Sequence, residues 1–205
     1  MTDAERMLKL IRERRSVRRF QDRPVSREVL AVLLEAASFA PSAGNRQDWL
    51  FTVVAAQDMK ARMAEAVNRR WRAIIEAHRD LGIIEEVERY AARFGDFAHA
   101  PAVVLVSCRR PDAAQETLLG PLATAASGGF ASAAMAAQTL MLAAHASGLA
   151  TCCMTGALAA SQELAELAGL GHRQEIVCLV ALGYPAESPS APDRKPLHEI
   201  VRFVE

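Results

Sequence analysis

The pattern of apolar and polar positions predicts helices in most of the segments between four short apolar runs. In the first segment, apolar residues recur every three to four positions, which predicts an amphipathic helix over residues 3–14 with Asp3 at its N-cap. Ser26 is placed to cap a second helix, whose apolar residues again share one face. The further predicted helices cover residues 59–78, 83–94, 130–146 and 161–170.

The four apolar runs predict the strands of a central sheet. They cover residues 50–56, 100–108, 149–154 and 175–185. The run at 50–56 is continuously apolar, which is typical of a strand buried on both faces. The chain shows neither an internal repeat nor a linker, so the pattern predicts one α+β domain over residues 1–205, with helices on both sides of the sheet.

A long uncharged stretch separates Glu116 from Glu163. We do not expect it to cross a membrane, because it is rich in Ala, Ser, Thr and Gly and is interrupted by "GPL" and "SGG". It predicts a fully buried helix at 130–146, covered either by its own chain or by the same helix of a second copy across a two-fold axis. The second reading predicts a homodimer, with close approach at Ala133, Ala134, Ala136, Ala137 and Ala144.

The overall charge excludes one large class of function. Lys plus Arg and Asp plus Glu number 24 each, whereas nucleic-acid binding requires a basic excess, so no nucleic-acid partner is expected. The N-terminus lacks the apolar core of a secretory signal, which predicts a cytoplasmic protein. The cysteines and histidines lack metal-ligand spacing, so no metal site is expected, and the four cysteines are predicted to be buried free thiols.

Positive charge is concentrated near the N-terminus, in "RERRSVRRF". Guanidinium groups bind phosphate through paired hydrogen bonds and a hydroxyl adds a further donor, so Arg14, Arg15 and Ser16 could hold a phosphate. The same arginines could also be an exposed helix end, where positive charge is favourable.

Three other stretches carry polar or glycine signals. The loop "PSAGNRQDW" offers Ser42, Asn45 and Gln47 for hydrogen bonds to a polar heterocycle or a sugar-like chain, or it is an ordinary turn. Gly156 follows a predicted strand, where a glycine lets a backbone N–H approach a flat ligand, or it forms a simple turn. The basic pair in "PDRKPL" could return to a phosphate or belong to a solvated tail.

Four blocks in this order resemble the FMN-dependent nitroreductase family. They are "RRSVRRFQDRPVSREVLAVLLEAASFAPSAGNRQDWLFTVV", "AAMAAQTLMLAAHASGLATCCMTG", "EIVCLVALGYP" and "RKPLHEIV". The resemblance implies an α+β nitroreductase-like fold, in which a mostly antiparallel central sheet is flanked by helices. It also implies a homodimer that holds FMN between its two chains.

The resemblance also assigns roles to individual residues. Arg14 and Ser16 would hold the FMN phosphate and ribityl chain, and Arg18 would lie near the pyrimidine edge of the flavin. The backbone N–H of Gly156 would face flavin N5. The full set of residues implied to bind the cofactor is Arg14, Arg15, Ser16, Arg18, Pro41, Ser42, Asn45, Gln47, Asn68, Thr155, Gly156 and Arg194.

The implied activity is an FMN-dependent oxidoreductase that uses NADH or NADPH to reduce nitroaromatic, quinone or related acceptors by a ping-pong mechanism, with the flavin carrying the chemistry. The alternatives are a specialised branch, such as a reductive dehalogenase or a flavin-cleaving enzyme, and a flavin-binding protein without turnover. The chain departs from the family pattern at Asp48, Ser132, Thr139 and Cys153, where a proline, an acidic residue, an asparagine and an aromatic residue are often found.

Overall fold

Within residues 1–120 and 128–205, which the computed structural model describes, four strands form one sheet in the order β1-β2-β4-β3. Every neighbouring pair is antiparallel, which confirms the predicted mostly antiparallel central sheet. The strands are β1 (Trp49–Val54), β2 (Ala102–Arg109), β3 (Ala150–Met154) and β4 (Gln174–Gly183).

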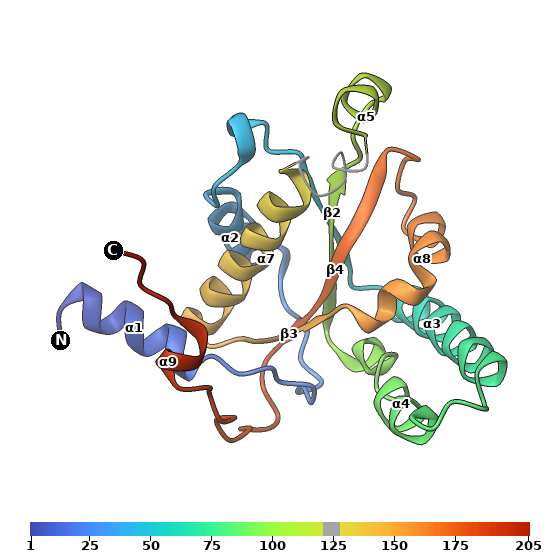
Figure 1. The fold of residues 1–205 in the computed structure, drawn as a ribbon. Coiled ribbons are helices and arrows are strands. Elements are labelled where there is room, and N and C mark those ends of the chain that lie inside the picture. Colours follow the sequence, from blue (N-terminus) through green and yellow to red (C-terminus); the bar gives the residue numbers. More distant parts are fainter. Residues whose placement is uncertain (121–127) are drawn as a thin grey trace.

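Helices cover both faces of this sheet, as predicted (Figure 1). The α-helices are α1 (Asp3–Glu13), α2 (Arg27–Ser38), α3 (Gln57–Ala77), α4 (Ile84–Ala91), α5 (Ala113–Leu119), α7 (Gly129–Ala146), α8 (Ser161–Leu167) and α9 (Leu197–Ile200). The short 3₁₀ helices are η1 (Ala43–Asn45), η2 (Asp96–His99) and η4 (Gly156–Ala160).

The two faces of the sheet build two separate cores. Side chains of β2 alternate between the faces, so that Val103 and Leu105 pack beneath α3 and α8, while Val104 and Val106 pack beneath α2 and α7. Residues 102–108 of β2 are all buried, because β2 pairs with a strand on each edge and is covered on each face.

The prediction that residues 50–56 form a strand buried on both faces is wrong for the single chain. β1 lies at the edge of the sheet, and only Val54 among its residues is fully buried. Leu50 remains 42% exposed. The continuous apolar run therefore reflects an edge strand with one half-covered face.

The start of α1 differs from the prediction, whereas the start of α2 agrees with it. Thr2, and not Asp3, caps α1: its hydroxyl accepts from the Glu5 N–H at 3.2 Å, and the Glu5 carboxylate accepts from the Thr2 N–H at 2.7 Å. This reciprocal pair is a capping box, which needs the glutamate three residues after the cap. The Ser26 hydroxyl caps α2 as predicted and accepts from the Val29 N–H at 3.4 Å.

The uncharged helix α7 is buried on one face only, so the prediction of complete burial is wrong. Its small residues Ala133, Ala137 and Ala144 pack against the sheet and α2 of the same chain and are not free to meet a second helix. The outward face still carries Phe130 and Met135, which are 46% and 41% exposed. A sheet covers a helix from one side only, and nothing in the described chain covers the other side of α7 here.

Two further apolar segments lie at the ends of the chain. α1 contributes no buried residue, and its apolar Met7, Leu8 and Ile11 are all exposed. The C-terminal segment is also exposed at its large apolar residues, which are Leu197, Ile200, Val201, Phe203 and Val204. Figure 1 shows α1 and the C-terminal tail outside the two helical layers, on the side where α7 ends.

Candidate functional site

The residues after α1 run along the outer edge of β3. Ser16 forms a parallel bridge with Thr151, and the Val17 N–H donates to the Thr151 carbonyl at 3.0 Å. Val17 is 5% exposed and anchors this segment. Because side chains alternate along extended backbone, Arg14, Ser16 and Arg18 lie on the side opposite Val17.

Arg14 and Arg15 line a cavity of about 250 Å³ at the start of β3, together with Thr151, His145 and Glu187. The two arginines are used differently. Arg15 Nη1 donates to the carbonyls of Arg12 at 2.5 Å and Arg14 at 2.9 Å, so Arg15 binds the C-terminal end of α1. The helix-end alternative therefore describes Arg15. Among the described residues, the Arg14 side chain makes no hydrogen bond or ion pair.

Glu187 fixes the course of the arginine segment. Its carboxylate accepts from the backbone N–H groups of Arg18 at 2.6 Å and Arg19 at 3.0 Å. The hydrogen bond from the Arg18 N–H is the main reason why the pKa of Glu187 lies below its usual value. The carboxylate therefore stays ionised at neutral pH and holds the extended segment against the chain that follows β4.

A smaller cavity of about 100 Å³ lies at the other end of β3. Arg18, Arg93, Phe94, Cys153 and Gly156 are among its lining residues. Because Gly156 opens η4, its N–H has no acceptor within that helix and is available to a ligand.

Aromatic side chains make a glycine necessary at position 156. A Cβ there would lie 2.2 Å from the Phe94 ring, and the indole N–H of Trp71 donates to the Gly156 carbonyl at 2.8 Å. The aromatic residues Trp71, Phe94 and Tyr90 contact one another in turn, with ring centroids 5.0 and 4.9 Å apart. The glycine is thus explained by close packing of an aromatic ring, and it lines the same cavity as Arg18.

These two cavities lie along one strand, and we call the predicted residues that line them, together with Ser16, the β3-edge site. Arg14, Arg15, Arg18, Thr155 and Gly156 line the cavities, and Ser16 is bridged to Thr151 of β3. The structure therefore brings together six of the predicted cofactor-binding residues. The site offers guanidinium and hydroxyl groups near one end of β3 and a guanidinium and a backbone N–H near the other.

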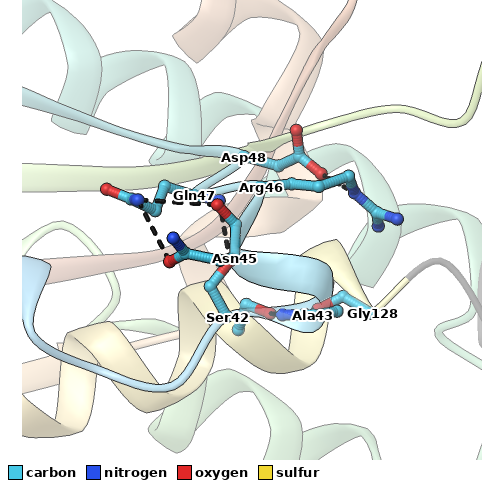
Figure 2. A network of polar contacts seen from close by, with 8 residues as sticks. Ser42, Ala43, Asn45, Arg46, Gln47, Asp48 and Gly128 are labelled. Carbon is cyan, nitrogen blue, oxygen red and sulfur yellow. Dashed lines mark hydrogen bonds and ion pairs between the residues drawn. The ribbon is translucent and has the colours of Figure 1, made fainter.

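The loop of residues 42–47 forms a second, internally bonded cluster (Figure 2). The Ser42 hydroxyl accepts from the Gln47 N–H at 2.7 Å, and the Gln47 amide donates to Asn45 Oδ1 at 3.1 Å. Asn45 and Gln47 both have a φ of 52°, a left-handed conformation that is uncommon for a residue with a side chain. The hydrogen bonds hold both amide side chains together on one side of the loop.

Ser132 ties this loop to the start of α7. Its hydroxyl accepts from the Ala43 N–H at 3.1 Å and donates to the Gly128 carbonyl at 2.5 Å. Ser132 is one of the departures from the family pattern, and it is buried. A small hydroxyl at this position therefore fixes the loop, because one oxygen serves as acceptor and donor at once.

Asp48 holds the other end of the loop. Its carboxylate pairs with Arg46 Nε at 2.8 Å, and its backbone carbonyl accepts from the Arg109 N–H at 2.9 Å. Figure 2 shows this ion pair on the opposite side of the loop from the Asn45 and Gln47 amides. The carboxylate that replaces the common proline is thus turned away from the two amides.

The loop and the β3-edge site lie at opposite ends of α7. Ser132 binds the loop in the first turn of this helix, whereas His145, in its last turn, lines the Arg14 cavity. A helix of 18 residues is about 27 Å long. A single chain therefore does not bring the loop residues Ser42, Asn45 and Gln47 to the Arg14 and Ser16 side chains.

Three predicted residues lie outside both clusters. Asn68 lies on α3, packs against Gly95 and lines a groove between α3 and α4, and it lines neither cavity of the β3-edge site. Pro41 is exposed just before the loop, and Arg194 is exposed in the C-terminal tail. The sequence did not predict a role for Phe94, Arg93 or Glu187, although the spacing of Tyr90 and Phe94 on one helical face was a visible signal.

The prediction of four buried thiols is wrong for Cys153. Cys108, Cys152 and Cys178 are buried, but Cys153 is exposed and lines the smaller cavity. Among the described residues, no group of His, Cys, Asp and Glu is arranged to hold a metal ion. In that same part of the chain, no helix combines the length and apolar character needed to span a membrane.

Known proteins share this fold and much of this sequence. The sequence profile of the nitroreductase family matches residues 11–184. An NADH dehydrogenase from Thermus thermophilus is 33% identical over 92% of this chain and 91% of its own. A relative from Methanothermobacter thermautotrophicus, named NADH dehydrogenase/NAD(P)H nitroreductase, is 30% identical over 91% of this chain and 81% of its own. A solved nitroreductase with bound FMN from Desulfitobacterium hafniense is 25% identical, with a TM-score of 0.73 and 100% of both chains covered.

An antiparallel sheet between helical layers, with a basic segment along one edge strand, is thus the architecture of a flavin-dependent oxidoreductase. The chain belongs to the nitroreductase family, and these relatives and the FMN-bound structure identify it as an NAD(P)H-dependent oxidoreductase that uses FMN. This confirms the family, the class of enzyme and the class of cofactor that the four sequence blocks imply.

Proposed function

We propose that two copies of this chain bind FMN between them and use NADH or NADPH to reduce nitroaromatic, quinone or related acceptors by a ping-pong mechanism. The observation that carries the proposal is the separation of the two clusters by the length of α7. If one FMN contacts both the β3-edge site and the 42–47 loop, the loop must come from a second chain.

The residues of the β3-edge site fit FMN from its phosphate to its ring. Arg14 offers a guanidinium for the phosphate, and Ser16 lies next along the same side of the segment for the phosphate or ribityl oxygens. Arg18 and Gly156 lie further along β3, where they line a cavity together with Phe94. The order of these groups along the strand matches the order of phosphate, sugar chain and ring in FMN.

When bound, FMN supplies the redox chemistry by taking two electrons from a nicotinamide and giving them to an acceptor. The positive charge of Arg18 would stabilise negative charge at the pyrimidine edge of the ring. The Gly156 N–H would donate a hydrogen bond to N5 and fix the ring in its plane. The Asn45 and Gln47 amides of the second chain would complete the polar contacts.

Exposed apolar surface supports the second copy. The outward face of α7, α1 and the C-terminal segment all expose large apolar side chains in the single chain. Burial of such surface is the dominant favourable contribution to protein association. These three segments lie on the same side of the molecule (Figure 1), and Glu13 at the end of α1 lines the Arg14 cavity. Of the small residues predicted to meet a second helix, Ala133, Ala136, Ala137 and Ala144 are already buried within the chain, whereas Ala134 is exposed.

The proposal is tested by the cofactor and the kinetics of the purified protein. We expect non-covalent FMN, and not FAD, after acid extraction and chromatography. Initial rates of NADH or NADPH oxidation at several fixed quinone concentrations should give parallel double-reciprocal lines, since both substrates would use one slot in turn. Recovery of FAD alone, or intersecting lines, would contradict the corresponding part of the proposal.

A further inference from the structure

Trp71 connects the core beneath α3 to the proposed flavin contact at Gly156, and the proposed function does not use it. Met63, Val67 and Trp71 recur every four residues along α3, so their side chains lie on the same face of the helix. Met63 and Val67 are fully buried, and Trp71 continues their stripe as a half-buried ring that packs against the same core. The stripe thus carries the indole to Gly156, the first residue of η4.

The indole makes a specific polar contact in addition to its packing. Its N–H donates to the Gly156 carbonyl at 2.8 Å. An apolar ring would be sufficient to fill the core at this position, whereas tryptophan adds a donor that usually finds a partner when it is buried. The partner here belongs to the residue whose own N–H is proposed to bind flavin N5.

A glycine needs such contacts if its N–H is to keep one direction. Glycine has the most permissive backbone of all residues, so its own conformational preference does not fix the two peptide groups beside it. The peptide group is planar and trans, so the Gly156 N–H points opposite to the Thr155 carbonyl. That carbonyl accepts from the Leu158 N–H at 2.9 Å. Leu158 therefore fixes the peptide group before the Gly156 Cα, and the Trp71 indole fixes the peptide group after it.

Phe94 restrains the same glycine from a third direction. A Cβ at Gly156 would lie 2.2 Å from the Phe94 ring, and the centroid of this ring lies 5.0 Å from that of Trp71. Tyr90 packs edge-on against Phe94 at 4.9 Å and supports it from the other side. A backbone donor that must meet one ligand atom needs this restraint, because a hydrogen bond weakens steeply when its angle departs from linear.

We propose that Trp71 is a positioning residue of the flavin site. By binding the Gly156 carbonyl, its indole N–H holds the Gly156 N–H in the direction from which it donates to N5 of bound FMN. Trp71 itself lines the groove between α3 and α4, so its effect on FMN passes through Gly156. The inference rests on the proposed function, because the contact between Gly156 and N5 belongs to it.

The most specific test is the scalar coupling between the two nitrogens across the hydrogen bond from Gly156 to N5, measured by NMR with ¹⁵N-labelled protein and ¹⁵N-labelled FMN. A water molecule that replaced the glycine donor could not produce this coupling. We expect the coupling in the wild-type protein. It should be reduced or lost in Trp71→Phe, which keeps an aromatic ring without the donor. Trp49→Phe, the same change at the only other tryptophan, should keep the wild-type coupling.

An amino acid with the shape of tryptophan separates the N–H from the ring. In β-(3-benzothienyl)alanine, sulfur replaces the indole N–H, and the residue can be placed at position 71 through an amber codon. This protein should lose the coupling to the same extent as Trp71→Phe. A full coupling in the benzothienyl protein would show that Trp71 acts by packing alone, and would overturn the proposal even if Trp71→Phe folds poorly.

The second readout is the rate constant with which NADH or NADPH reduces bound FMN in a single turnover without oxygen, at saturating FMN. Loss of one hydrogen bond between neutral groups should lower this rate constant by a factor of about 2 to 12 in both Trp71 variants. Trp49→Phe should keep the wild-type rate constant. Wild-type rate constants in both Trp71 variants, together with a lowered melting temperature, would leave Trp71 a structural residue and contradict the proposal.

The wild-type spectrum separates this inference from the proposed function. FMN that binds without a coupling between Gly156 and N5 would contradict the proposed position of the flavin, and with it the role of Trp71. A wild-type coupling that both Trp71 variants retain in full would overturn the role of Trp71 alone, and would leave the flavin position supported.

Discussion

Replacement of Arg14 by Ala should weaken FMN binding far more than replacement of the neighbouring arginines. Arg14 lines the cavity beside Thr151 and makes none of the backbone hydrogen bonds that engage Arg15. A hydrogen bond to a charged group contributes about 1.5–3 kcal/mol, which corresponds to a factor of about 10 to 150 in Kd. We therefore expect the Kd for FMN to rise by that factor in Arg14→Ala.

Two matched variants control for the loss of positive charge. Arg27 is exposed at the start of α2, so Arg27→Ala should leave FMN affinity within about a factor of two, as expected for a surface substitution. Arg15→Ala removes the contacts to the end of α1. It should therefore lower the melting temperature, while its Kd for FMN should rise less than that of Arg14→Ala. Flavin fluorescence titrations at one ionic strength measure the Kd for FMN in all three arginine variants. Equal affinities of the Arg14 and Arg27 variants would refute the phosphate role of Arg14.

Three other substitutions test the geometry of the two clusters. Gly156→Ala should lose FMN and lower the melting temperature, because the new Cβ would lie 2.2 Å from the Phe94 ring; a normally stable variant with full FMN content would contradict this. Ser132→Ala should weaken FMN binding while Thr139→Ala does not, because only Ser132 forms a hydrogen bond to the 42–47 loop; an equal Kd for FMN in the two variants would contradict a role of this hydrogen bond in FMN binding. Phe130→Asp on the outward face of α7 should shift light-scattering mass towards the monomer, whereas an unchanged dimer would show that this face is not in the interface.

The sequence predicted the elements well because local signals define them. Ser26 before an apolar face starts α2 where expected, and the apolar runs become the four strands. It did not predict which side of an element would be covered, since burial depends on neighbours that are distant in sequence. β1 looks like a central strand but lies at the edge, and Ala133, Ala137 and Ala144 of α7 pack within their own chain.

The candidate site was predictable only in part for the same reason. The "RRS" block identified the right segment, but only the structure shows that Arg15 binds the end of α1 while Arg14 lines a cavity. Phe94 lies in a part of the sequence without diagnostic residues, and its packing on Gly156 arises from tertiary structure. The position of the two clusters at opposite ends of α7, a helix about 27 Å long, is likewise invisible in a linear motif.

The most direct test of the shared FMN site is a mixed dimer. One chain carries Arg14→Ala and the other carries Asn45→Ala with Gln47→Ala, and differently tagged copies are co-expressed and purified as the mixed species. The FMN concentration is chosen so that neither variant homodimer retains the cofactor. If each site combines the β3 edge of one chain with the loop of the other, one of the two sites in the mixed dimer is intact and one FMN per dimer should bind. A mixed dimer without FMN would show that each site lies within a single chain, and so would contradict the account.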